Sequence, residues 1–155
     1  MHLTLVRHGE AGSATNDLGD AGRCLTAHGR EQARATGRAL RERGVAPTHA
    51  WSSPLVRAVQ TAELIVSSLE FRGALAARDD LYPDSSPGGL VAALAALPAS
   101  ADVLVVGHMP YMAMAASVFL DLSVSAFATA EAFRVEIAGP GQGRLQWRFA
   151  GRFLG

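Results

Sequence analysis

The sequence of 155 residues predicts an α/β fold, a three-layer αβα sandwich whose mostly parallel central sheet has an antiparallel edge. Stretches of strand length alternate with stretches of helical periodicity along the chain. The clearest strand, Asp102–Gly107, is a continuous apolar run typical of a buried parallel strand. Near the C-terminus, Glu131–Ile137 and Arg144–Phe149 alternate polar and apolar residues around a Gly-Pro-Gly sequence, which predicts an antiparallel hairpin.

The first third of the chain predicts a strand, a loop and a helix. His2–Val6 has the character of a short strand and is followed by a polar loop over Gly9–Arg23. Thr26 is a favourable N-cap residue. We therefore expect a helix to run from there to about Arg43, where Gly44 closes it.

The middle of the chain predicts a second strand and helix at Thr48–Ser52 and beyond. Ser53 is a good N-cap and Pro54 suits the first helical position, so we expect the helix to begin there. Four apolar residues at helical spacing form its buried face: Ala58, Ala62, Ile65 and Leu69. The elements expected next are a strand at Leu75–Arg78, a loop at Asp79–Gly89, and helices at Leu90–Leu97 and Pro110–Leu120, all in one domain over residues 1–155.

The overall composition excludes several classes of partner. Formal net charge is zero, so no global field attracts nucleic acid or a membrane surface, and three arginines on the first helix are interpreted as a solvated face. The N-terminus lacks the features of a signal peptide, and no apolar run is long enough to span a bilayer.

The single cysteine, Cys24, fits a cytoplasmic protein, and we expect a monomer. All 14 basic residues are arginine, which excludes a Walker-type lysine and a lysine nucleophile.

Polar residues follow three of the predicted strands at the points where they end. Arg7 and His8 follow the first strand, Arg57 lies in the first turn of the helix after the second, and His108 follows the DVLVVG strand. In open α/β sheets, ligands bind beyond the carboxyl ends of the strands. Two arginines and two histidines at that edge predict a site for a phosphoryl group, because the guanidinium fork matches phosphate oxygens.

A neutral histidine in such a site can attack phosphorus. Neighbouring arginines disfavour the imidazolium and neutralise charge on the phosphoryl oxygens during transfer. His8 is the better nucleophile, because Gly9 allows close approach of the backbone, and His108 assists by donating to a phosphoryl oxygen. This chemistry needs no metal and no cofactor, and the five histidines lack metal-ligand spacing.

Four motifs resemble those of the histidine phosphatase (phosphoglycerate mutase-like) superfamily and occur in the family's order. They are LVRHGEA at 5–11, LTxxGxxQA at 25–33, SSPLVRAVQTA at 52–62 and GHMP at 107–110. The resemblance implies the phosphoglycerate mutase-like fold. It also implies that His8 is the phosphorylated nucleophile, and that Arg7, Arg57 and His108 complete the phosphate pocket.

Within that superfamily, the short chain most resembles the SixA-type phosphohistidine phosphatases. Met109 follows the second histidine where the acid-phosphatase branch has aspartate, and the chain has no room for the insertions of the mutases. Arg23, which precedes the LT motif, is either an additional phosphate contact or a solvated loop residue. The resemblance implies a phosphatase acting on phosphohistidine in a protein. A small-molecule phosphomonoesterase or mutase, and a non-catalytic phosphate-binding module, remain as alternatives.

Two further features of the sequence bear on the chemistry. Larger relatives use a glutamate as general acid, and the candidates here are Glu10, Asp79, Asp80 and Asp84, each of which could instead be a solvated turn residue. Cys24 and Arg30 fit the Cys-x5-Arg pattern of cysteine phosphatases. The residues before Cys24 do not form a strand, so we interpret this match as coincidental.

Overall fold

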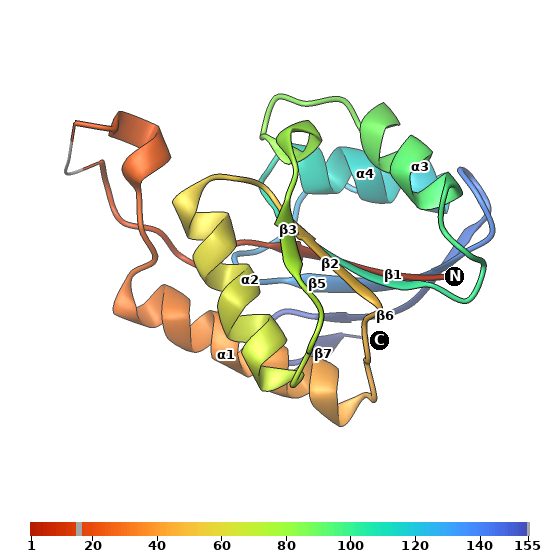
Figure 1. The fold of residues 1–155 in the computed structure, drawn as a ribbon, viewed down its shortest axis with the longest axis horizontal. Coiled ribbons are helices and arrows are strands. Elements are labelled where there is room, and N and C mark those ends of the chain that lie inside the picture. Colours follow the sequence, from red (N-terminus) through yellow and green to blue (C-terminus); the bar gives the residue numbers. More distant parts are fainter. Residues whose placement is uncertain (15–16, 155) are drawn as a thin grey trace.

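The computed structural model describes residues 1–14 and 17–154 and contains a seven-stranded sheet of order β3-β2-β4-β1-β5-β6-β7 (Figure 1). The strands are β1 (His2–Arg7), β2 (His49–Ser52), β3 (Leu75–Ala77), β4 (Asp102–Gly107), β5 (Ala132–Ile137), β6 (Gly143–Phe149) and β7 (Phe153–Leu154). Residues 15 and 16, part of the predicted loop, lie outside the described residues.

Helices cover both faces of this sheet, which confirms the predicted αβα sandwich (Figure 1). On one face lie α1 (Ala27–Glu42) and α2 (Val56–Ser68), and on the other lie α3 (Gly88–Ala95) and α4 (Tyr111–Leu120). Alternate residues of the central strands contribute to the two cores: Leu3 and Leu5 of β1 pack with α4, whereas Val6 packs with α2. The continuous apolar run in β4 follows from this burial on both faces.

The sheet is parallel in one half and antiparallel in the other. β4 pairs in parallel with β1 and β2, and β2 pairs in parallel with β3. β5 runs antiparallel to β1, and the predicted hairpin of β5 and β6 is present. The antiparallel part is larger than predicted, because β7 adds a short strand that pairs with β6 and has too few residues to show a periodicity.

The predicted start of α2 is wrong. The helix begins at Val56, its N-cap is Leu55, and no side chain caps it. The Ser53 hydroxyl instead accepts a hydrogen bond from the Leu55 backbone N–H (3.3 Å) and lies 2.7 Å from Nε2 of His108. The sequence predicts that the Ser53 hydroxyl caps the helix, but in the fold this hydroxyl contacts His108, which follows another strand.

The predicted start of α1 is confirmed. Thr26 is its N-cap, and the hydroxyl accepts a hydrogen bond from the backbone N–H of Gly29 (2.9 Å). Loss of such a cap leaves a helical N–H without its protein partner. We expect Thr26→Ala to lower the free energy of unfolding by about 1 kcal/mol. Chemical denaturation measures this change, and Thr26→Ser should retain most of the stability; equal losses in both variants would contradict the capping role.

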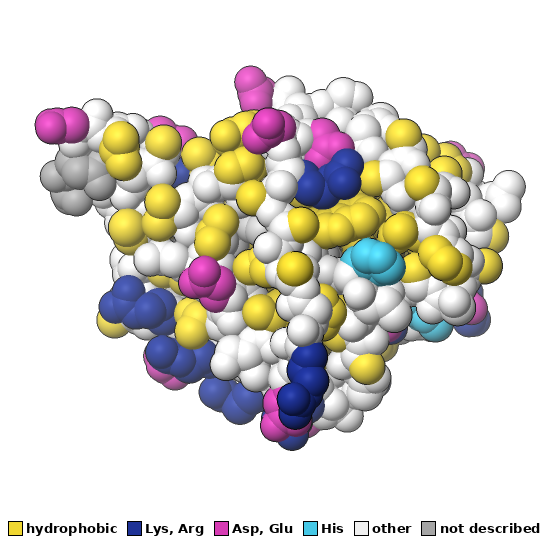
Figure 2. Space-filling view, viewed as in Figure 1, with side chains coloured by type: hydrophobic (Ala, Val, Ile, Leu, Met, Phe, Trp, Pro, Cys, Tyr) yellow, Lys and Arg dark blue, Asp and Glu magenta, His cyan; other side chains and the backbone are white. Residues whose placement is uncertain are grey.

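Basic side chains line α1 on the face drawn in Figure 2, with a few acidic ones beside them. Arg34 pairs with Glu31 on that helix, and Arg41 pairs with Glu70 beyond α2 (3.2 Å). These pairs support the interpretation of the helix arginines as a solvated face. No helix in the described ranges is long and apolar enough to cross a membrane.

Candidate active site

The carboxyl ends of two neighbouring parallel strands, β1 and β4, bring the two predicted histidines together. His8 follows β1 and His108 follows β4, and these strands are neighbours with Arg7 opposite Gly107. The two imidazole rings lie 5.1 Å apart between centroids, at 61° to each other. Both histidines are buried, so the sequence-predicted convergence is present in the fold.

The hydrogen bond of His8 determines which ring nitrogen carries the proton. Nδ1 lies 2.7 Å from the backbone carbonyl oxygen of Gly9, which can only accept, so Nδ1 is the donor and Nε2 keeps its lone pair in the neutral ring. Burial and the charges of Arg57 and Arg7 together lower the pKa of His8 to about 4, although the hydrogen bond with Gly9 acts in the opposite direction. The ring is thus neutral at pH 7, with Nε2 available.

His108 is held beside it in a neutral state as well. Its Nε2 lies 2.7 Å from Oγ of Ser53, and its Nδ1 is buried without a hydrogen-bond partner in the described structure. Burial, together with the effects of His8 and Arg57, lowers the pKa of His108 to about 3. An anion bound between these groups would reverse part of that effect, since it favours the imidazolium.

We expect both histidines to stay neutral down to pH 5, because both pKa values are depressed below the ordinary value near 6.5. Protons then bind the unfolded chain more readily, so these groups reduce the free energy of unfolding as pH falls through 6.5 toward the folded values. Titration of the imidazole nitrogens by NMR measures both the midpoints and the His8 tautomer. A His8 midpoint near 6.5 would contradict this electrostatic description.

Two arginines frame the histidines and have unused donors. Arg7 donates from Nη1 to the carbonyl oxygen of Phe127 (2.8 Å), and Arg57, in the first turn of α2, is almost fully buried. The Nε atoms of both arginines are buried without a partner among the described residues. Buried donors without partners are costly, so these groups together with His108 Nδ1 are candidates for binding an anion.

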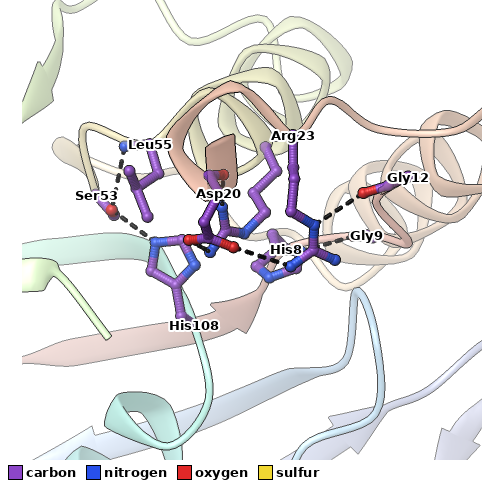
Figure 3. A network of polar contacts seen from close by, with 9 residues as sticks. His8, Gly9, Gly12, Asp20, Arg23, Ser53, Leu55 and His108 are labelled. Atoms are coloured by element: carbon purple, nitrogen blue, oxygen red, sulfur yellow. Dashed lines mark hydrogen bonds and ion pairs between the residues drawn. The ribbon is translucent and has the colours of Figure 1, made fainter. Parts of the chain in front are cut away.

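Arg23 and Asp20 complete the rim of this site (Figure 3). Arg23 donates from Nε to the carbonyl oxygen of Gly12 (2.8 Å) and from Nη1 to the carboxylate of Asp20 (3.2 Å). Asp20 also accepts from Arg57, through its carboxylate (3.2 Å) and its backbone oxygen (3.0 Å). The hydrogen bond from Arg23 lowers the pKa of Asp20, and the charge of Arg57 adds to this. Arg23 is therefore held by Gly12 and Asp20 beside the candidate site rather than free in solvent.

Close backbone packing of Gly9 and Gly29 fixes the position of His8. A Cβ on Gly9 would lie 2.5 Å from the carbonyl oxygen of Gly29, and a Cβ on Gly29 would lie 2.0 Å from that of Glu10. The backbone N–H of Gly9 also donates to Oγ1 of Thr61 (3.1 Å) on α2. Both glycines and this threonine belong to the quoted motifs, and their packing sets the position of His8 relative to α1 and α2.

The predicted candidates for a general acid have other contacts. Glu10 accepts from the hydroxyl of Thr26 (2.9 Å), and Asp80 forms a two-pronged ion pair with Arg78 (2.6 and 3.0 Å). Asp79 and Asp84 are exposed. In the described structure, none of these four carboxylates forms a hydrogen bond with His8 or His108.

The cysteine of the Cys-x5-Arg pattern lies outside this constellation. Cys24 is exposed, precedes α1 and donates weakly to the carbonyl oxygen of Gly22 (3.4 Å). Arg30 donates to the carbonyl oxygen of Leu25 (3.1 Å), and Cys24 does not follow a strand. The pattern therefore lacks the phosphate loop that thiolate chemistry requires. Within the described ranges, no group of three or more His, Cys, Asp or Glu side chains is arranged to hold a metal.

Sequence reasoning missed three residues that shape the site. The sequence predicts Ser53 as a helix cap, gives Thr61 a place in a motif but no role, and has no pattern that distinguishes Asp20 from other polar residues. Their contacts with His108, Gly9 and the arginines depend on the packing of α2 and of the loop before Arg23. For Ser53 and Thr61, the available sequence signal was their place in the motif SSPxxRAxQTA.

Comparison with solved structures identifies strong likenesses over nearly the whole chain. The structure of the protein histidine phosphatase SixA complexed with tungstate covers 97% of both chains, with a TM-score of 0.88 and 27% identity. A putative phosphohistidine phosphatase SixA from Nakamurella multipartitia matches with a TM-score of 0.70 and 29% identity, over 97% of this chain and 96% of the other.

Sequence comparison agrees with the structural likeness. The serine/threonine-protein phosphatase Pgam5, mitochondrial, of Drosophila pseudoobscura pseudoobscura is 39% identical over 75 residues, which are 47% of this chain and 25% of that protein. The match thus spans about a quarter of the length of this curated relative. The family model described as histidine phosphatase superfamily (branch 1) matches residues 3–81, about half of the chain, and the chain therefore belongs to the histidine phosphatase superfamily.

Proposed function

We propose that this protein is a phosphatase that removes the phosphoryl group from phosphohistidine in a protein, through a covalent phosphohistidine on His8. The observation that carries the proposal is the short contact between Nδ1 of His8 and the backbone oxygen of Gly9, which makes Nδ1 the donor and leaves Nε2 with its lone pair in the neutral ring. Burial favours that neutral ring, because it lowers the pKa of His8. Arg7 and Arg57 each have a buried Nε donor without a partner among the described residues, which supports a role for both arginines in phosphate binding. Family membership supports phosphatase chemistry at this site.

In the first step, the lone pair of His8 Nε2 attacks phosphorus, and the bond from phosphorus to the leaving nitrogen breaks. The leaving imidazole of the substrate keeps the electron pair of that bond and takes a proton from solvent. Arg7, Arg57 and His108 donate to the phosphoryl oxygens, whose charge they stabilise as it redistributes. Imidazole is a better leaving group than an alkoxide, so this step does not require a dedicated carboxylic acid.

In the second step, a water oxygen attacks the phosphorus of phospho-His8, and the bond from phosphorus to Nε2 breaks. The electron pair returns to Nε2, which restores the neutral ring, and the water proton passes to solvent. The hydrogen bond from Nδ1 to Gly9 holds the same tautomer through both steps. All groups assigned here belong to the chain itself, and we propose that turnover needs no metal.

Two observations favour a protein substrate over a small ester. The likeness to SixA structures covers nearly the whole chain, and those proteins are described as protein histidine or phosphohistidine phosphatases. The four candidate carboxylates for a general acid bond elsewhere or lie exposed, and this suits a leaving group that needs little help. A phosphohistidine side chain meets that condition.

The test is a comparison of kcat/KM for a phosphohistidine protein with values for a panel of small phosphate esters. We expect a clear preference for the phosphohistidine protein. A preference for the esters would instead identify a small-molecule phosphatase or mutase. Binding of phosphate without turnover of any substrate would identify a phosphate-binding module.

A further inference from the structure

The carboxylate of Asp20 makes polar contacts with two arginines at the candidate phosphoryl site. Asp20 lies on a short 3-10 turn, η1 (Gly19–Gly22), that the fold brings against the N-terminal end of α2. One carboxylate oxygen accepts from Nη2 of Arg57 and the other from Nη1 of Arg23, each at 3.2 Å. The side chain thus offers two anionic oxygens to two guanidinium groups, as a phosphoryl group would.

The same carboxylate also acts on the second histidine. Its negative charge opposes the lowering of the His108 pKa by burial, so the two groups are within electrostatic reach. Figure 3 shows the Asp20 carboxylate between His108 and Arg23. An incoming phosphoryl dianion would meet this charge at close range, and like charges at such distances repel.

The three partners differ in their freedom to move. Arg57 has only 5% of its side chain exposed, whereas the Asp20 side chain is 65% exposed. Asp20 can therefore rotate into water at small cost, since water replaces its lost hydrogen bonds. Arg57 would remain in place and present its freed Nη2 donor to another anion.

We propose that Asp20 is an internal ligand of the phosphoryl site, which phosphoryl oxygens must displace from Arg57 and Arg23. This inference rests on the proposed function, because it takes those arginines as phosphate-binding groups. Competition by a tethered carboxylate lowers the affinity for free phosphate, the product of the reaction. Asp20 thereby sets the affinity of the site and favours release of product.

The experiment measures binding of inorganic phosphate by calorimetry to the whole chain and to Asp20→Asn. Asparagine keeps the shape of the side chain and removes its charge, so we expect the Kd for phosphate to fall about tenfold. Asp17→Asn is the matched control, because Asp17 is an exposed carboxylate in the same loop. Its Kd should equal that of the unmodified protein.

A second readout separates this role from a structural one. In turnover of p-nitrophenyl phosphate, Asp20→Asn should lower both the KM and the inhibition constant for phosphate, with a smaller change in kcat. Unchanged or weaker phosphate binding would overturn the inference and identify Asp20 as a residue that positions the arginines. A large loss of kcat with unchanged phosphate inhibition would overturn it in favour of a catalytic role. Absence of phosphate binding and turnover in all three proteins would overturn the proposed function itself.

Discussion

Replacement of His8 by alanine is expected to lower turnover of every phosphoryl substrate by at least roughly 10⁴-fold, because it removes the atom that accepts the phosphoryl group. Among the described residues we expect no second nucleophile to take its place, because Nε2 of His108 contacts Ser53 and Cys24 is exposed and follows no strand. Release of inorganic phosphate from a phosphohistidine protein measures the loss. Circular dichroism of the variant confirms that the loss is not one of folding.

Two substitutions serve as controls for the His8 variant. Cys24→Ser should retain wild-type turnover, since the cysteine lies outside the candidate site. His28→Ala should also retain it, because His28 is exposed on α1. Loss of activity in Cys24→Ser with full activity in the His8 variant would contradict the assignment of the nucleophile.

Replacement of Arg57 by alanine is expected to lower kcat/KM by roughly 100- to 1,000-fold, the usual effect of removing a donor that stabilises charge in the transition state. Arg57 is almost fully buried at the start of α2, and its Nε has no partner among the described residues. The change also raises the pKa of His8, because the charge of Arg57 helps to keep that ring neutral. Steady-state kinetics measures the first effect, and NMR titration measures the second.

A lysine in place of Arg57 separates the effect of the positive charge from that of the planar guanidinium group. Arg57→Lys keeps the positive charge and loses the planar fork, so we expect it to recover only a small part of the lost activity. Arg38→Ala, on the exposed face of α1, should behave like the unmodified protein. Wild-type kinetics for Arg57→Ala would contradict the assignment of this arginine to the phosphoryl pocket.

Periodic segments made most of the fold predictable. β4 is buried on both faces and so consists of a run of apolar residues, and α1 has both a capping threonine and a closing glycine. β7 could not be predicted, because two residues carry no period and the strand exists only through pairing with β6. The start of α2 was misassigned because a contact with His108 decides the position of the Ser53 hydroxyl.

The candidate site was predictable to the extent that strand ends determine it. Arg7, His8 and His108 lie at the ends of adjacent parallel strands, and a sequence that predicts those strands also predicts that the residues meet. Asp20 was not predictable in this way. It reaches the site from a loop, and its partners Arg23 and Arg57 are brought to it by packing that no local pattern records.

The most direct test of the proposed mechanism is to trap the phosphorylated enzyme. The protein is mixed rapidly with a phosphohistidine protein carrying a labelled phosphoryl group, quenched without acid, digested and analysed by mass spectrometry. We predict an acid-labile phosphoryl group on the peptide that contains His8. Turnover without any trapped label, or label on another residue such as Cys24, would contradict the account.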